Sequence, residues 1–116
     1  MQLIFLALHN LPDNTPIQAN VLISTYDLVM KDKGVLGAIS WKYLIVDEAH
    51  RLKDQNSKLY EVLNAFKTTN RLLVTGTPLQ NTLKELWCLL HFLDPGKFDD
   101  FEEFEQKVHA KYIRMK

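Results

Sequence analysis

Two adjacent carboxylates, Asp47 and Glu48, follow directly on an apolar run at residues 43–46 (YLIV). A run of this kind, rich in branched side chains, predicts a strand buried on both faces, as in a parallel α/β sheet. Ligands of such sheets bind just past the carboxyl ends of the strands, where both carboxylates would stand. At that rim Asp47 could hold Mg²⁺, usually through water, and Glu48 could orient or deprotonate an attacking water. This is the arrangement of a Walker B motif, and the alternative is an acidic cap after a core strand.

A second apolar run ends in a turn of small polar residues. Residues 71–78 (RLLVTGTP) predict a strand that opens into hydroxyl and glycine residues, and residues 79–87 (LQNTLKELW) start a helix. With DEAH at 47–50 and KELWCLLHFLDPGKF at 84–98, this pattern resembles motifs II and III of the SNF2 family of ATP-dependent DNA translocases and chromatin remodelers. Residues 29–81 resemble most closely the chromodomain-helicase-DNA-binding (CHD) branch, and the resemblance covers residues 20 to about 105.

The resemblance implies a fold class and a division of the chain. The fold class is α/β: a partial RecA-like lobe, as in the P-loop NTPases of helicase superfamily 2, with a parallel sheet and a helical extension at the C-terminus. Residues 1–19 depart from the family pattern and are unassigned, and residues 20–93 form a partial ATP-binding lobe 1 with motifs Ib, II and III. Residues 94–116 begin the helical protrusion that SNF2 motors insert after motif III.

The resemblance also implies roles for individual residues. Asp47 and Glu48 are the expected catalytic residues, with His50 beside them at the nucleotide and Asp47 as the Mg²⁺ ligand. The residues expected to couple this site to the rest of the motor are those of motif III, which His50 would face: Thr75, Gly76, Thr77 and Gln80. The complete motor would use ATP and Mg²⁺, bind duplex DNA, nucleosomes and a second motor lobe but no membrane, and work in the nucleus.

A short predicted strand at residues 21–23 (VLI) ends at the block of residues 24–27 (STYD), which contains the hydroxyl residues Ser24 and Thr25. This block resembles motif Ib of the family, whose hydroxyls lie along the DNA backbone. Hydroxyl groups can hydrogen-bond phosphate oxygens without reading the base sequence. Either residue could equally be the N-cap of the next helix, and the two interpretations are compatible.

The histidines and the cysteine do not predict a metal centre. The four histidines are scattered, show neither H-E-x-x-H nor a Cys/His cluster, and stand at positions 9, 50, 91 and 109. The single Cys88 lies within an apolar helix, excludes an internal disulfide and is expected to fill the core.

Three helices are expected around these motifs. Leu59, Val62, Leu63 and Phe66 recur at the spacing of an amphipathic helix. A second helix carries an apolar face from residue 83 to 93, and Thr82 with Glu85 forms a T-x-x-E capping box at its start. The final segment is acidic early and basic late, which complements a helix macrodipole and predicts a solvated helix.

Composition places the chain among single globular domains. It has 116 residues, of which 47% are hydrophobic, and 14 basic residues balance 14 acidic ones. Zero net charge gives no global attraction to nucleic acid, so any DNA contact must be local. Residues 1–8 lack the basic start and cleavage site of a signal peptide and are expected to begin a strand or a helix.

The phosphate-binding Walker A pattern, G-x-x-x-x-G-K-[ST], is absent from the printed sequence, whose glycines stand at 34, 37, 76 and 96. Without that loop a triphosphate loses most of its positioning. The second lobe, which in the family supplies the arginines that complete catalysis, is missing too. We therefore expect a piece of motor lobe 1, from a truncated isoform, a partial gene product or an expressed fragment, that does not hydrolyse ATP alone.

In lobes of this type the motif III strand lies between the Walker B and Walker A strands. Residues 71–75 would then form an unpaired apolar edge unless residues 3–8 supply a substitute strand.

Three other interpretations stay open to different degrees. A DEAH-type RNA helicase shares motif II but carries Ser-Ala-Thr at motif III, where this chain has TGTP at 75–78. A non-catalytic DNA- or partner-binding fragment is compatible with the missing Walker A loop. The third alternative is a degraded reading frame without a stable fold.

Overall fold

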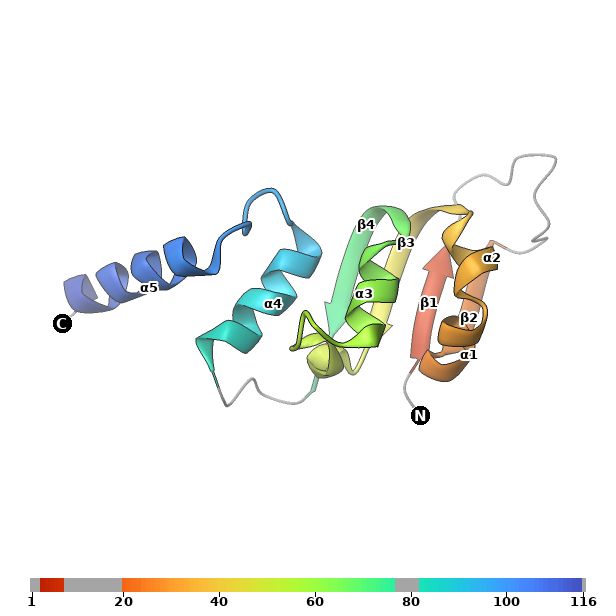
Figure 1. The fold of residues 1–116 in the computed structure, drawn as a ribbon, viewed down its shortest axis with the longest axis horizontal. Coiled ribbons are helices and arrows are strands. Elements are labelled where there is room, and N and C mark those ends of the chain that lie inside the picture. Colours follow the sequence, from red (N-terminus) through yellow and green to blue (C-terminus); the bar gives the residue numbers. More distant parts are fainter. Residues whose placement is uncertain (1–2, 8–19, 77–81, 116) are drawn as a thin grey trace.

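The computed structural model describes residues 3–7, 20–76 and 82–115. Its elements, in chain order (Figure 1), are strands β1 (Leu3–Ala7) and β2 (Val21–Thr25), helices α1 (Tyr26–Lys31) and α2 (Lys33–Gly37), strand β3 (Ser40–Asp47), the 3₁₀-helix η1 (Ala49–Leu52), helix α3 (Lys58–Asn64), strand β4 (Lys67–Val74), and helices α4 (Leu83–Leu93) and α5 (Phe101–Met115). Thr77 and Gln80, two of the expected motif III residues, lie outside the described ranges.

The four strands form one mixed sheet in the order β2-β1-β3-β4. β3 and β4 are parallel, with Asp47 opposite Val74, as the sequence predicted. β1 runs antiparallel to both β2 and β3, so the sheet contains the predicted parallel pair but is mixed. Apolar periodicity reports which side chains are buried but carries no information about strand direction. The α/β class itself is confirmed.

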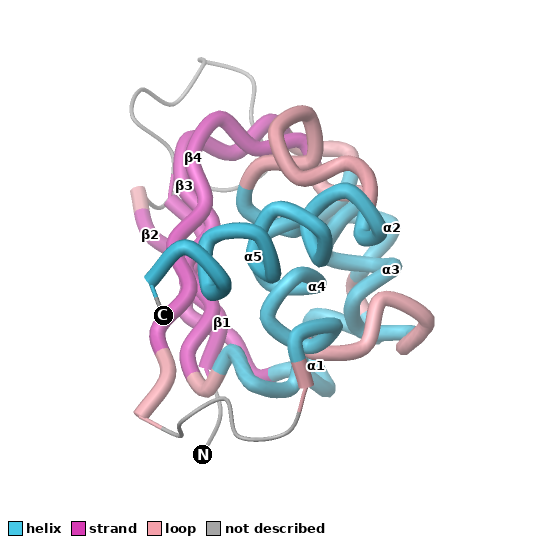
Figure 2. Tube along the Cα trace, turned by 90° about the vertical axis from the view of Figure 1, so that its left-hand side faces the viewer, coloured by secondary structure: helices cyan, strands magenta, loops and turns pink. Residues whose placement is uncertain are grey.

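Helices cover one face of this sheet, and no described helix or strand covers the other, which we call the open face (Figure 2). Figure 2 shows α1 to α4 on the same side of the strands. On the covered face Ile4, Leu6, Leu44 and Val46 are fully buried. Tyr43, on the same strand as Leu44, is 45% exposed. The prediction that this strand is buried on both faces is therefore wrong, because the helices pack on one side only.

The open face carries an apolar row across the whole sheet. Strand register places Ile23 beside Phe5, Phe5 beside Ile45, and Ile45 beside Leu72. Ile23 and Leu72 are 57% and 52% exposed. β4 is the edge strand of the described sheet, and β1 lies between β2 and β3 rather than beside β4. The expected apolar edge at residues 71–75 is thus present, and residues 3–7 do not fill it.

The helices predicted around the motifs form as expected. The apolar stripe of α3 is buried, including Phe66 just beyond the helix end, and Ser57 caps the helix by accepting a hydrogen bond from the amide of Tyr60. Trp87, Cys88, Leu89 and Phe92 of α4 are buried. Cys88 is 1% exposed and fills the core as expected, and this burial raises the pKa of its thiol. α5 buries no residue and begins with acidic side chains, which confirms a solvated helix.

Arg71, at the centre of β4, joins the ends of α3 and α4. Its guanidinium donates to the main-chain carbonyls of Asn64, Phe66 and Phe92 at 3.1, 3.3 and 2.9 Å. The guanidinium carbon also lies 4.4 Å from the centroid of the Phe92 ring. The carbonyls of Asn64 and Phe92 belong to the C-terminal turns of α3 and α4, which leave acceptors without helical partners and carry partial negative charge, and that of Phe66 lies just past α3. Burial lowers the pKa of Arg71, although an arginine remains a cation at any physiological pH.

Among the described residues no helix is both long enough and apolar enough to cross a membrane.

The open sheet face predicts self-association of the chain. Exposed apolar strands with a free edge are templates for intermolecular pairing. We expect concentration-dependent oligomers in size-exclusion chromatography with light scattering, and strong binding of a hydrophobic dye. Leu72→Lys should shift the population toward monomer. Thr69→Lys adds the same charge at a polar exposed position of the same strand and should have little effect. A monodisperse wild-type monomer with a sharp melt would contradict the prediction.

Replacing Arg71 should destabilise the fold even when the charge is kept. Arg71→Lys keeps the cation but loses the planar fork that serves three carbonyls. Leaving such acceptors unpaired lowers the free energy of unfolding by about 2 kcal/mol. Urea unfolding followed by circular dichroism measures the change. Arg114→Lys, at an exposed position near the end of α5, is the matched control and should unfold like wild type.

Candidate functional site

The two predicted carboxylates stand where β3 ends. Asp47 is the last residue of the strand, and Glu48 follows in the left-handed conformation, with φ 53° and ψ 48°. This turn sends the chain from the strand into η1. A left-handed backbone is uncommon for a residue other than glycine and costs of order 1 kcal/mol or more. Glu48 is the one described residue other than glycine with positive φ, so the surrounding contacts must hold it there.

A tyrosine from the start of α1 provides such contacts. The hydroxyl of Tyr26 donates to the main-chain carbonyl of Asp47 and lies 3.2 Å from the carbonyl oxygen of Glu48. The Tyr26 side chain is buried, and the guanidinium carbon of Arg51 lies 4.9 Å from its ring centroid. Burial raises the pKa of Tyr26 to about 12, partly opposed by Arg51. The hydroxyl therefore keeps its proton and remains a donor at physiological pH.

His50 lies beside Glu48. Its Nδ1 is 3.3 Å from Oε2 of Glu48, with side chains 29% and 40% exposed. Within the described ranges this Nδ1 has no hydrogen-bond partner, so its contact with Glu48 is not a hydrogen bond. The pair is a close electrostatic contact, which is an ion pair only when the imidazole is protonated. The expected role of His50 toward motif III stays a prediction, since Gln80 and Thr77 lie outside the described residues.

The beginning of motif III is at the same edge of the sheet. Because β3 and β4 are parallel and Asp47 pairs with Val74, Thr75 and Gly76 leave the sheet next to the carboxylates. Both residues are exposed. The structure thus brings together the first half of motif III and the whole of DEAH, as the order of parallel strands requires.

A second link joins the carboxylate turn to α4. Nζ of Lys53, just after η1, lies 3.9 Å from Oε1 of Glu85. Thr82 caps α4 by accepting a hydrogen bond from the amide of Glu85 at 3.1 Å, which confirms the threonine half of the predicted capping box. Lys53 is 45% exposed, so solvent screens this ion pair and its contribution to stability is small.

Thr25 acts as the N-cap of α1. Its Oγ1 accepts a hydrogen bond from the amide of Leu28 at 3.3 Å, and the Oγ of Ser24 donates to the carbonyl of Thr25 at 3.4 Å. The capping interpretation is confirmed for Thr25. The implied contact of both residues with a DNA backbone remains a prediction, compatible with their partial exposure.

The residues present fit part of a nucleotide site. Mg²⁺ is commonly held by one or two carboxylates with water and substrate phosphates, and Asp47 at the strand end can supply one carboxylate. Groups of three or more His, Cys, Asp or Glu side chains that could hold a metal ion do not occur among the described residues, and His9 lies outside them. The sequence holds no Walker A loop, so these residues offer no cradle for the phosphates.

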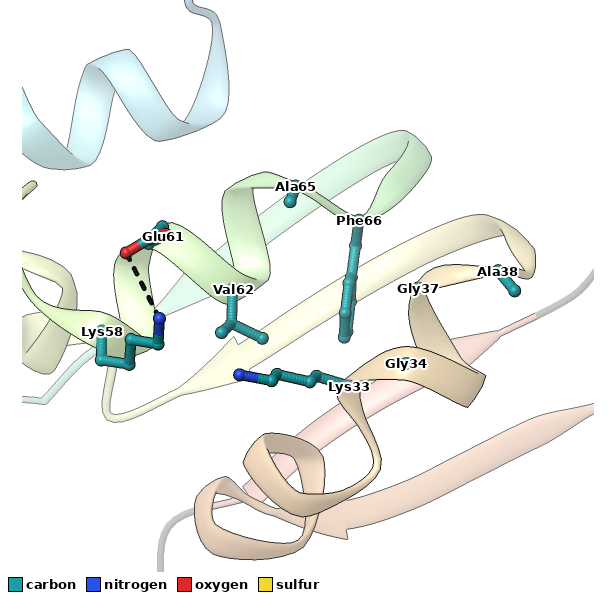
Figure 3. A pocket seen from close by; sticks show the side chains of 9 residues that line it. All are labelled: Lys33, Gly34, Gly37, Ala38, Lys58, Glu61, Val62, Ala65 and Phe66. Carbon is teal, nitrogen blue, oxygen red and sulfur yellow. Dashed lines mark ion pairs between the residues drawn. The ribbon is translucent and has the colours of Figure 1, made fainter.

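A separate pocket of about 480 Å³ lies between α2 and α3 (Figure 3). Lys33, Lys58, Glu61 and Phe66 are among its lining residues. Lys58 and Glu61 face each other at 3.8 Å, and none of the predicted site residues lines this pocket. It is therefore not the nucleotide site that the motifs predict.

Tyr26 lies in the block that resembles motif Ib, but the sequence alone assigned it no role at the carboxylates. A tyrosine at the start of a helix is ordinary in a sequence, and its two carbonyl acceptors are 21 and 22 residues away. In the sequence, Arg71 is likewise only the first residue of an apolar run. Both interact with main-chain carbonyls, whose positions depend on the tertiary fold.

Comparisons with known proteins agree with this geometry. A family model described as the SNF2-related domain matches residues 8–115. Among curated proteins, Protein CHROMATIN REMODELING 5 of Arabidopsis thaliana is 61% identical over 89 residues, covering 77% of this chain and 5% of the relative. Chromodomain-helicase-DNA-binding protein 1 of Gallus gallus is 52% identical over 100 residues, covering 86% of this chain and 6% of the relative. The chain thus spans about a twentieth of the length of these relatives.

A solved structure shares the fold. The Sulfolobus solfataricus SWI2/SNF2 ATPase core in complex with dsDNA matches with a TM-score of 0.60 at 34% identity, covering 72% of this chain and 18% of that one. The family model spans nearly the whole chain, and the two relatives are more than half identical to it over the matched residues. The chain therefore belongs to the SNF2-related family and has the α/β fold of part of an SNF2 ATPase core.

Proposed function

We propose that this chain is part of the ATPase motor of a CHD-like, ATP-dependent DNA translocase that remodels nucleosomes in the nucleus. The observation that carries the proposal is the parallel pairing of β3 with β4, which sets the carboxylates of DEAH beside the start of motif III. The relatives with chromatin-remodeling names support the assignment, and so does the DNA-bound state of the solved ATPase core.

In the proposed site each residue has one task. Asp47 holds Mg²⁺ through water, and Glu48 orients the attacking water and accepts its proton. His50 contacts the nucleotide site and, with Thr75, Gly76, Thr77 and Gln80, couples it to the rest of the motor. Ser24 and Thr25 contact the phosphate backbone of duplex DNA. In the complete motor, hydrolysis of Mg²⁺-bound ATP to ADP and phosphate would supply the free energy of translocation.

The chain alone is proposed to be inactive, because the sequence has no Walker A loop and no second lobe to complete the site. The second candidate function is a non-catalytic fragment that binds DNA or a partner of a complete remodeler. The open apolar sheet face favours a partner-binding role, since such a face is available for docking. Measurements on the isolated chain and on a complete motor separate the two functions.

The isolated chain should show no DNA-stimulated ATPase activity above background. Asp47 and Glu48 can handle metal and water, but the chain lacks the groups that hold the triphosphate. Phosphate release is measured with and without duplex DNA. Turnover that Glu48→Gln abolishes would contradict the prediction, because contaminating activity would not depend on that residue.

A complete motor can be built by grafting residues 20–115 into the matching segment of the Gallus gallus relative. In that chimera Glu48→Gln should lower kcat by about 10² or more and leave ATP binding largely intact, because glutamine keeps the shape but cannot accept a proton. Asp47→Asn should also weaken Mg²⁺-dependent binding. Steady-state hydrolysis and nucleotide titration measure the two effects.

The matched control for this experiment is Glu61→Gln, which makes the same chemical change at an exposed position on α3 that faces Lys58. It should leave hydrolysis unchanged. An inactive wild-type chimera would argue against a motor role for this segment. Normal hydrolysis by both Walker B variants would show that the assignment of Asp47 and Glu48 is wrong.

A further inference from the structure

We propose that Tyr26 is a positioning residue for the Glu48 carboxylate. Its hydroxyl holds the two peptide groups that flank the Cα of Glu48, and so sets the direction of the Glu48 side chain. The inference rests on the proposed function of Glu48 and gives Tyr26, which lies in the block that resembles motif Ib, a role at the carboxylate turn. It starts from the contacts of the Tyr26 hydroxyl with the carbonyl oxygens of Asp47 and Glu48.

The geometry of a peptide chain explains why two carbonyls are enough. The carbonyl of Asp47 lies in the peptide plane that precedes the Cα of Glu48, and the carbonyl of Glu48 lies in the plane that follows it. Each plane is rigid, so fixing both planes fixes φ and ψ of Glu48. These two angles determine the direction of the bond from Cα to Cβ, and hence where the carboxylate can reach. A single hydroxyl facing both carbonyls therefore controls the orientation of the proposed catalytic side chain.

The conformation held in this way is one that Glu48 would not choose by itself. Its φ of 53° lies in the left-handed region, which is disfavoured for a residue with a Cβ. Without a restraint, the turn would relax toward other conformations and the carboxylate would move with it. Strained backbone of this kind persists where the surrounding structure holds it, and the hydroxyl of Tyr26 is a restraint on both of its flanking peptides.

Tyr26 is itself held in place. Its side chain is 4% exposed, and Arg51, from the same turn as Glu48, lies over its ring. The ring thus packs against the turn through its face and bonds to the turn through its hydroxyl. Replacing the hydroxyl by hydrogen removes the second interaction and keeps the first. Tyr26→Phe therefore tests the hydroxyl with little change in shape.

The chain offers a close control in Tyr60. This tyrosine is 3% exposed, and its hydroxyl donates to the main-chain carbonyl of Cys88 at 3.0 Å. Burial raises the pKa of Tyr60 to about 12, as it does for Tyr26. Tyr60→Phe therefore removes the same kind of buried hydroxyl-to-carbonyl bond, but its acceptor belongs to α4 and not to the carboxylate turn.

The experiment compares the two variants in the grafted motor under saturating duplex DNA. Tyr26→Phe should lower kcat about 10-fold, because the Glu48 carboxylate is still present but less precisely positioned. The KM for ATP should stay within about twofold, since groups that touch the nucleotide are unchanged. Tyr60→Phe should keep both parameters within about twofold of wild type, while both variants lower the melting temperature to a similar small extent.

A double variant gives a readout that a merely structural role would not move. If Tyr26 acts through Glu48, adding Tyr26→Phe to Glu48→Gln should cause no further loss of kcat, because residues that work as a unit are not additive. Adding Tyr60→Phe to Glu48→Gln should also cause no loss, but only because Tyr60→Phe alone has none.

Four results would overturn the inference. Two concern kcat of the single variants: a normal kcat in Tyr26→Phe, or an equal fall of kcat in Tyr60→Phe. The others are loss of folded protein in Tyr26→Phe but not in Tyr60→Phe, which would make the role structural, and an additive loss of kcat in the Tyr26 double variant. The Glu48→Gln arm separates this inference from the proposed function. If Glu48→Gln abolishes hydrolysis and Tyr26→Phe does not slow it, the positioning role fails alone. If Glu48→Gln hydrolyses ATP normally, the proposed function fails first.

Discussion

The parallel pairing of β3 with β4 is the constraint on which the arrangement of the site depends. Parallel neighbours cannot be joined by a tight turn, so the chain between them must cross the sheet, and it does so through η1 and α3. The same pairing makes both strands end at one edge. The carboxylates after β3 and the hydroxyl and glycine residues after β4 are neighbours for that reason, although about two dozen residues separate them in the sequence.

Polar contacts, from buried to partly exposed, then hold the helices against this strand pair. Arg71 reaches from β4 to the C-terminal ends of α3 and α4, and Tyr60 bonds from α3 to the carbonyl of Cys88 in α4. The ring of Tyr60 also meets the Phe92 ring edge-on, with centroids 5.5 Å apart. Such contacts fix a register that apolar packing alone leaves adjustable. The exposed Lys53–Glu85 pair adds little by comparison, because solvent screens it.

The two faces of the sheet differ. One face is covered by helices, and the other presents an apolar row from Ile23 to Leu72. Covering such a row with another apolar surface removes it from water, which is favourable in free energy. The segment that matches this chain makes up about a twentieth of the length of the relatives.

The sequence by itself determined the family, the α/β class and the position of the proposed carboxylates. Spacing was sufficient for α3 and α4, because a helix repeats its buried positions within a few residues. It was not sufficient for β3, where an unbroken apolar run suggested burial on both faces and Tyr43 proved to be half exposed. Strand direction, the left-handed turn at Glu48 and its contact with Tyr26 were decided only by the tertiary structure. All three depend on main-chain groups brought together from distant parts of the chain, and every residue type has the same main-chain groups, so residue types alone could not reveal them.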